Sequence, residues 1–204
     1  MAGVRTKGCG AGAMTSILIY AGSARRGAFS RQLAAAATTI ISEAGGKPTL
    51  IDLADFDVPL YNADIEDAAG IPQPVVDYRR LVATHQGMII ATPEYNGFIT
   101  PLLLNMLCWA SRPSPGDDFG AVFQNKPVAL LASSPGRLGG VRVIPRLRDV
   151  VAELDMVPVP GFATVPQAAE GFTPRGRLAD TGIEAGLTAL VDRLLAASRQ
   201  HPPI

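Results

Sequence analysis

Short apolar runs alternate along the chain with longer segments in which apolar residues recur at helical spacing. Such runs, when bounded by polar or glycine-rich sequence, are typical of buried strands, and they lie at Ser16–Ala21, Thr49–Leu53, Gly87–Ala91, Pro127–Ala132 and Met156–Val159. Strands that alternate with helices form a parallel sheet with right-handed crossovers. The pattern therefore predicts an α/β fold with a doubly wound, five-stranded parallel sheet.

The helical segments carry boundary signals of their own, and they cover residues 29–44, 74–84, 101–109, 142–154 and 183–195. Gly45 follows the first of them, where glycine is a typical C-terminal residue. Thr100 can cap the third helix through its hydroxyl, and Pro101 suits a first helical position. Pro145 requires the fourth helix either to begin near Arg142 or to kink.

The chain is long enough for one domain of ordinary size, because 204 residues can bury a full core. We expect this domain to cover residues 15–200, with a disordered glycine-rich extension over 1–14 and a short tail over 201–204. The extension has no apolar run of signal-peptide length, and no stretch approaches the roughly 20 apolar residues of a membrane span. Within the domain, 54–72 and 160–177 are predicted to be irregular connections.

Charge and residue counts exclude several classes of protein. Lysine plus arginine equals aspartate plus glutamate at 18 each, so no net field attracts the chain to nucleic acid or to an acidic membrane. Cys9 and Cys108 have no metal-binding or redox spacing, and a reducing, cytosolic setting is expected. His85 ends a predicted helix, where a structural role as a cation near the helix dipole outweighs a catalytic one, and His201 is in the tail. The chain therefore has almost no residues from which a Ser-His-Asp or Cys-His catalytic mechanism could be built.

Polar or glycine-rich loops follow three of the predicted strands. They cover residues 22–30 after the first strand, 92–97 after the third and 133–140 after the fourth. In open α/β sheets, ligands bind beyond the carboxyl ends of the strands. These loops are therefore the candidates for a cofactor site.

The first of these loops has the residues that bind an anion. Ser23 and Ser30 offer hydroxyls, Arg25 and Arg26 offer positive charge, and the helix that follows directs its first backbone N–H groups outward. A phosphate monoester fits this arrangement, and the alternative is an ordinary tight turn with two solvated arginines. The loop matches neither the GxGxxG nor the Walker pattern, which disfavours ATP and a dinucleotide bound in the Rossmann manner.

The helix over Thr100–Trp109 is apolar nearly all round, with Asn105 as its main polar residue. Such a helix requires burial on two sides, and a second subunit can supply one of them. We therefore expect a homodimer or homotetramer through this helix, and the alternative is a cover made by the domain's own loops. Cys108 is expected to act as a small hydrophobic residue, because no neighbouring cation would stabilise a thiolate.

Five groups of residues at the strand ends and around the apolar helix form a recognisable series. They are Gly22-Ser23-Ala24-Arg25, Asp52-Leu53 with Pro59-Leu60-Tyr61-Asn62, Thr92-Pro93-Glu94-Tyr95-Asn96-Gly97, Asn105 with Trp109-Ala110-Ser111-Arg112-Pro113, and Ser134-Pro135-Gly136 with Gly139-Gly140-Val141-Arg142. Together they resemble the NADPH-dependent FMN reductase family. The resemblance implies a flavodoxin-like, three-layer α/β/α domain with strand order 2-1-3-4-5. It also implies an oxidoreductase that passes hydride from NADPH or NADH through bound FMN to a quinone, free flavin, azo compound or metal oxyanion.

The resemblance assigns the cofactor contacts to the three loops. In the family, the first loop holds the FMN phosphate, the second lies along the isoalloxazine ring largely through backbone groups, and the third approaches the ring's other edge. The residues implied here are Ser23, Arg25, Phe29 and Ser30, then Pro93, Glu94, Tyr95, Asn96 and Gly97, and finally Ser133 and Ser134. No side chain need transfer a proton, because the flavin supplies the hydride chemistry, and no metal is expected.

Some positions depart from the family pattern or have two interpretations. Glu94 is either a brace bonded to neighbouring amides or a group that contacts substrate. The phosphate loop commonly has serine where Ala28 stands and asparagine where Ser30 stands, so a phosphate hydrogen bond worth about 1 kcal/mol is expected to be missing. Leu104 and Cys108 stand where the family usually has charged residues, which makes the helix more apolar.

Three functions are compatible with these residues. The first is the reductase. The second is an electron carrier, but such carriers dock through a strongly charged face, and a neutral chain with an apolar helix argues against one. The third is a flavin-binding regulatory module without turnover, which the departures at Ala28 and Ser30 keep open.

Overall fold

The computed structural model describes residues 14–114, 116 and 118–201. Except for Met14 and His201, the expected extension and tail lie outside the described residues, so the proposed domain limits stay a prediction. The elements are β1 (Ser16–Ala21), α1 (Phe29–Glu43), β2 (Lys47–Asp52), the 3₁₀ turn η1 (Leu53–Asp55), α2 (Ala63–Ala69), α3 (Gln73–Thr84), β3 (Gly87–Thr92), α4 (Pro101–Ala110), the 3₁₀ turn η2 (Ala121–Phe123), β4 (Pro127–Ser133), α5 (Val143–Glu153), β5 (Val157–Pro158), β6 (Ala163–Val165) and α6 (Thr181–Ser198).

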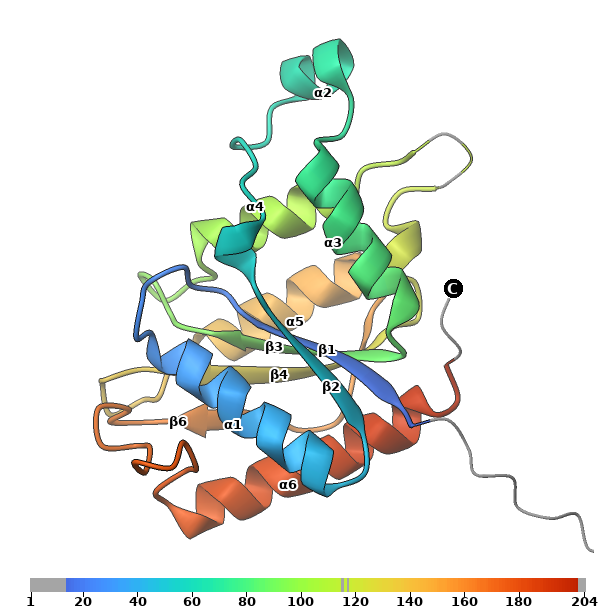
Figure 1. Ribbon diagram of the computed structural model, residues 1–204. Helices are drawn as coiled ribbons and strands as arrows, with labels where there is room; N and C mark the ends of the chain where they lie inside the picture. Colours follow the sequence, from blue (N-terminus) through green and yellow to red (C-terminus); the bar gives the residue numbers. More distant parts are fainter. Residues whose placement is uncertain (1–13, 115, 117, 202–204) are drawn as a thin grey trace, which may run out of the picture.

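The strands form one parallel sheet in the order β2-β1-β3-β4-β5, which confirms the predicted order (Figure 1). The fifth position is divided between two short strands. β5 pairs with Pro127 and Val128 at the start of β4, whereas β6 pairs with the last three residues of β4. The prediction of an irregular connection over 160–177 is therefore wrong at β6, because three residues carry too little periodicity to mark a strand.

α2 is the second element that the sequence pattern misses. The side chain of Asn62 caps it by accepting a 2.9 Å hydrogen bond from the N–H of Asp64, and Gly70 ends it with a φ of 72°. None of its residues is buried, and Figure 1 shows it projecting away from the sheet. A short helix without a buried face lacks the apolar periodicity by which the other helices were predicted.

Helices cover both faces of the sheet, with α1 and α6 on one face and α3, α4 and α5 on the other (Figure 1). Side chains along a strand point alternately to the two faces. In β1, Ile17 and Ile19 join the buried cluster under α1 and α6, whereas Leu18 and Tyr20 join the cluster under the other three helices. The sheet is thus the middle of three layers.

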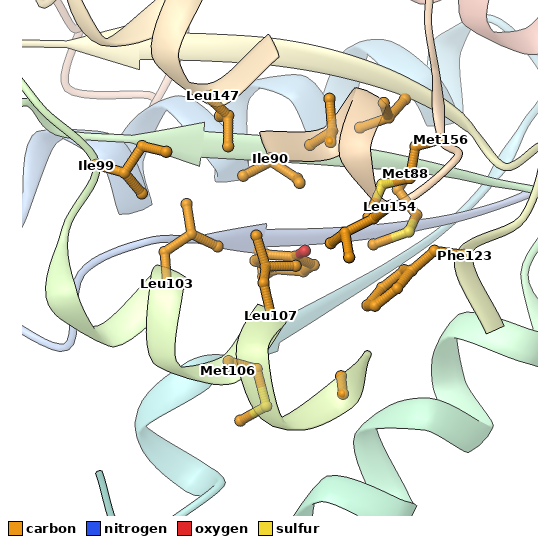
Figure 2. Close-up of a cluster of buried hydrophobic side chains, with 14 of the residues drawn as sticks. Met88, Ile90, Ile99, Leu103, Met106, Leu107, Phe123, Leu147, Leu154 and Met156 are labelled. Atoms are coloured by element: carbon orange, nitrogen blue, oxygen red, sulfur yellow. The ribbon is translucent and has the colours of Figure 1, made fainter. Parts of the chain in front are cut away.

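α4 begins with the predicted cap. Thr100 is its N-cap, with Oγ1 accepting a 3.4 Å hydrogen bond from the N–H of Leu103, and Pro101 is its first residue. Figure 2 shows Leu103 and Leu107 pointing toward the sheet, where Ile90 of β3 lies. The helix therefore packs one side against the core of its own domain.

The other helix boundaries agree with the sequence signals. α5 begins at Val143, so Pro145 falls in its first turn, where a missing N–H breaks no helical hydrogen bond, and no kink is needed. α1 ends at Glu43, and Gly45 beyond it has a φ of 79°. Among the described residues, no helix combines the length and the apolar character that crossing a membrane requires.

A buried lysine lies at the amino end of β4, opposite the loops at the strands' carboxyl ends. The side chain of Lys126 is fully buried, and its Nζ donates a 2.7 Å hydrogen bond to the carbonyl of His85. The imidazole of His85 lies within hydrogen-bond distance of Leu81 O and Thr49 Oγ1. Burial lowers the pKa of His85 and lowers that of Lys126 to about 8. His85 thus has the expected structural role, but as a buried ring whose pKa is lowered rather than as a cation near the helix dipole.

Lys126 predicts a specific dependence of stability on pH. Because its pKa falls from 10.5 in the unfolded chain to about 8 in the fold, only the unfolded chain holds the proton between these values, and stability rises with pH there by up to about 1.4 kcal/mol per unit. In urea unfolding between pH 7.5 and 9.5, this contribution should raise the free energy of unfolding of the natural chain with pH but be absent from Lys126→Met. The stability of the variant relative to the natural chain should therefore decline as pH rises. A constant difference between the two would contradict this assignment, since the other titrating groups are common to both.

Candidate functional site

A cavity of about 300 Å³ lies at the carboxyl ends of β1, β3 and β4. Its lining comes from the three loops that follow these strands: Ser23, Arg25, Ala28, Phe29, Ser30, Pro93, Glu94, Tyr95, Ser133, Ser134 and Pro135. Every site residue implied by the sequence is in this lining except Asn96 and Gly97. Two lining residues, Ala28 and Pro135, had not been assigned to the site.

The first two loops are held together at Gly22. Its N–H donates a 2.8 Å hydrogen bond to the carbonyl of Ala91, and Thr100 Oγ1 donates a 2.5 Å bond to the carbonyl of Gly22. A Cβ atom at this position would lie 2.9 Å from Thr92 Oγ1 and 3.2 Å from Leu103 Cβ. Only glycine fits without displacing its neighbours, so this contact fixes where the loop after β1 leaves the sheet.

The loop after β1 leads into the uncapped end of α1. Ser23 is buried and its Oγ accepts a hydrogen bond from the N–H of Arg25, while the guanidinium of Arg25 lies 5.8 Å from the ring centre of Phe29. Ala28 is the N-cap of α1 and makes no side-chain hydrogen bond to the first turn, which contains no acidic residue. The first N–H groups of the helix therefore remain open to an anion, and the helix dipole favours one there.

The loop after β3 forms a tight hairpin. Tyr95 and Phe98 exchange backbone hydrogen bonds of 3.1 and 2.9 Å, and Asn96 and Gly97 between them have φ angles of 53° and 75°. Two successive positive φ angles define a type I′ turn, for which Asn-Gly is the preferred pair. Asn96 and Gly97 therefore shape the turn and lie outside the cavity lining, whereas Tyr95 lines the cavity.

Glu94 connects the second loop to the third. The side chain of Glu94 is only 7% exposed, and its Oε1 accepts hydrogen bonds from Nε of Arg142, at 2.7 Å, and from Nη2. Arg142 is the residue before α5 and is largely exposed. Glu94 is thus a brace, but to an arginine of another loop rather than to neighbouring amides. Arg142 was not assigned to the site from the sequence, because nothing in its spacing from Glu94 marks the pair.

The loop after β4 completes the cavity. Ser133 is the last residue of β4 and is almost fully buried. The N–H of Ser134 donates to the carbonyl of Val165 at the end of β6, and its Oγ accepts a 3.1 Å hydrogen bond from the N–H of Gly136. The unexpected strand β6 therefore supports the third loop.

Three buried polar atoms at this cavity have no hydrogen-bond partner among the described residues. They are Ser30 Oγ in the first turn of α1, Glu94 Oε2 in the loop after β3 and Ser133 Oγ at the end of β4. A buried polar atom without a partner costs about 1–3 kcal/mol, and such atoms in a native fold call for an explanation. A polar ligand with an anionic group at the α1 end would provide partners for all three atoms. The residues present thus fit a phosphorylated, hydrogen-bonding cofactor.

A larger groove of about 420 Å³ lies beside α1 at the edge strand β2. Two of its three charged residues, Arg31 and Asp52, already form an ion pair with each other, and the third is Asp55. No buried side-chain atom without a partner among the described residues belongs to its lining. The cavity at the strand ends is smaller than this groove, but its location and its unmet hydrogen bonds favour it as the functional site.

The fold and the site together define a flavodoxin-like protein with a ligand cavity at the switch point of a parallel sheet. The sequence pattern of the NADPH-dependent FMN reductase family matches residues 15–170. The chain belongs to this family and is therefore a flavin-dependent oxidoreductase. The family's name specifies FMN as the flavin and NADPH as the electron donor.

Individual relatives agree with this membership. The chain is 36% identical over 132 residues to an NAD(P)H-dependent FMN reductase of Pseudomonas aeruginosa, covering 64% of this chain and 68% of the relative. It is 34% identical to a 2-hydroxy-1,4-benzoquinone reductase of a Burkholderia species, over 69% of this chain and 72% of that protein. A quinone reductase of Escherichia coli is 32% identical over 68% of this chain and 70% of its own length.

A solved structure with a similar fold is that of FerB, a flavoenzyme NAD(P)H:(acceptor) oxidoreductase from Paracoccus denitrificans. It superposes with a TM-score of 0.78 at 23% identity, covering 92% of this chain and 99% of that one. At this identity the likeness establishes the fold alone. It supports the flavodoxin-like architecture independently of the sequence matches.

Proposed function

We propose that the chain binds FMN in the cavity at the ends of β1, β3 and β4 and transfers hydride from NADPH or NADH to a quinone. The observation that carries this proposal is a set of buried polar atoms, in Ser30, Glu94 and Ser133 around one cavity, that have no hydrogen-bond partner in the described part of the chain. When bound, FMN accepts and donates hydride at its ring, and the protein supplies position and electrostatics. The chain's own task is therefore binding and orientation.

Each loop has a distinct part in this proposal. Ser23, Arg25 and the open N-terminus of α1 hold the phosphate, for which they provide a hydroxyl, a charge and backbone donors. The second and third loops flank the ring, with Pro93 and Tyr95 on one side and Ser133 and Ser134 on the other. Asn96 and Gly97 contribute by setting the hairpin.

A quinone is the proposed acceptor because of the relatives and of the rim of the cavity. Two of the relatives are named as quinone reductases. Tyr95, which lines the cavity, is 46% exposed, and its hairpin neighbour Phe98, which is outside the lining, is 45% exposed. Flat aromatic side chains at this place suit a flat, apolar acceptor. We also propose that the protein acts in the cytosol, because NADPH and NADH are cytosolic reductants.

A spectrum of the purified chain tests this function directly. We expect the chain, once supplied with FMN, to be yellow, to lose its absorption near 450 nm when NADPH is added without oxygen, and to regain it when a benzoquinone follows. A chain that binds FMN but is not bleached would be a flavin-binding module. A chain that takes up no FMN would contradict the proposed function altogether.

Arg25 should contribute strongly to FMN affinity. Its charge-assisted contact with phosphate is stronger than a neutral hydrogen bond, and Arg25→Ala is expected to raise the dissociation constant of FMN about tenfold. Fluorescence titration of the apoprotein with FMN measures this change. Arg26→Ala is the matched control, because Arg26 is also exposed but does not line the cavity. Equal effects of the two substitutions would contradict the phosphate assignment.

We also infer that a second copy of the chain packs on α4. The domain's own core buries Leu103, Leu107 and Trp109, while Asn105 binds the loop before α2 through Tyr61 N–H and Pro59 O. Part of the helix remains incompletely covered, and an apolar hollow of about 160 Å³ runs between it and α5, with Leu104, Leu107, Cys108, Ser111, Phe119, Val150, Glu153 and Leu154 in its lining. Burial raises the pKa of the Cys108 thiol, which suits a packing residue better than a nucleophile.

Leu104→Glu is expected to dissociate this assembly, because it places a charge in an apolar contact. Size-exclusion chromatography with light scattering should report the natural chain as a dimer or tetramer and the variant as a monomer. Leu50→Glu is the control, since Leu50 is an exposed apolar residue on the edge strand β2. A natural chain that is monomeric at micromolar concentration would contradict this inference.

A further inference from the structure

The Glu94–Arg142 ion pair has two ends in different surroundings. Glu94 lines the cavity and its side chain is 7% exposed, whereas the side chain of Arg142 is 63% exposed. Arg142 engages only Oε1, and Oε2 has no hydrogen-bond partner among the described residues. The negative end of the pair therefore belongs to the site, and the positive end lies toward solvent.

Such an arrangement leaves an unbalanced field inside the cavity. Charges act strongly on one another in a water-poor site, and much less across solvent. The exposed guanidinium is screened more than the buried carboxylate, so the pair as a whole presents net negative potential to a ligand in the cavity. Arg142 reduces this potential but does not cancel it.

We propose that this ion pair sets the reduction potential of the bound flavin, with Glu94 lowering it and Arg142 limiting the decrease. The inference rests on the proposed function, because it requires FMN in this cavity. Hydride brings two electrons and one proton, so the flavin ring gains one negative charge when NAD(P)H is oxidised to NAD(P)⁺. A carboxylate beside the ring disfavours that charge, and the reduced flavin becomes a stronger donor to the acceptor.

Opposite charges of one pair give this proposal a sharp test. Glu94→Gln and Arg142→Gln both break the same ion pair. The first keeps the shape of the side chain, and the second shortens a side chain that lies largely in solvent. If the pair only braced the two loops, both substitutions would loosen FMN and would move the potential in the same direction or not at all. If the charges act on the flavin, the two potentials must move in opposite directions.

The experiment measures the potential of the FMN-loaded protein by equilibration with a reference dye, together with the affinity of the apoprotein for oxidised FMN by fluorescence. Glu94→Gln should raise the potential, because the variant binds reduced FMN more tightly relative to oxidised FMN than the natural chain does. A change of up to about tenfold in this ratio corresponds to about 30 mV for two electrons. Arg142→Gln should lower the potential by a smaller amount that declines with added salt. Arg146→Gln removes an exposed charge one turn along α5 and is the matched control.

The possible outcomes separate this inference from the function on which it rests. Shifts of opposite sign that exceed the shift of Arg146→Gln support the proposal. Shifts of the same sign, shifts no larger than the control, or loss of FMN from both variants would overturn it while leaving the reductase intact. A natural chain that takes up no FMN would overturn the proposed function, and this inference with it.

Discussion

The site depends on one constraint: β1, β3 and β4 end side by side at the same edge of the sheet. Gly22 holds these ends together. Its N–H donates a hydrogen bond to Ala91 of β3, its carbonyl accepts one from the hydroxyl of Thr100, and no side chain would fit at this position. The same threonine caps α4. One cluster of contacts thus sets the exit of the first loop, the end of the second and the start of the helix that covers the core. Because parallel strands are paired in register, the loops that leave them converge on the cavity.

The sequence predicted those parts of the molecule in which local pattern and burial agree. Strands buried on both faces read as apolar runs, which is why β1, β3 and β4 were found within a residue of their observed limits. Thr100 with Pro101 and Gly45 are local signals, and each marked a real helix boundary. The loop residues were implied by resemblance, and the structure brings them together because their strands are neighbours. Their contacts with FMN stay a prediction.

The features that the sequence did not reveal depend on long-range contacts. β6 exists because it pairs with the end of β4, and its own three residues carry no strand pattern. The Glu94–Arg142 pair joins residues 48 positions apart in sequence, and no spacing rule relates such positions. His85 was expected to be a cation near a helix end. The neighbouring Lys126 buries its ammonium against the His85 carbonyl, and that environment disfavours a second charge.

The treatment of buried polar groups distinguishes the site from the core. Tyr20 and Tyr78 are both fully buried, yet their hydroxyls lie 2.8 Å apart and satisfy each other. Lys126 likewise has a carbonyl to donate to. At the cavity, by contrast, Ser30, Glu94 and Ser133 each keep a buried oxygen that no described residue binds. The remaining partnerless atoms among the described residues, in Ser198 and His201, lie at the C-terminal end of α6, where Gln86 ties that helix to the amino end of β3.

An unmet polar atom lowers stability unless something else binds it. Three such atoms around one cavity are costly for a protein that works without a ligand, and they are a consistent arrangement for one whose cavity is completed by a ligand. Binding to the folded state alone also stabilises that state. Under the proposed function, folding and cofactor binding are therefore coupled at this end of the sheet.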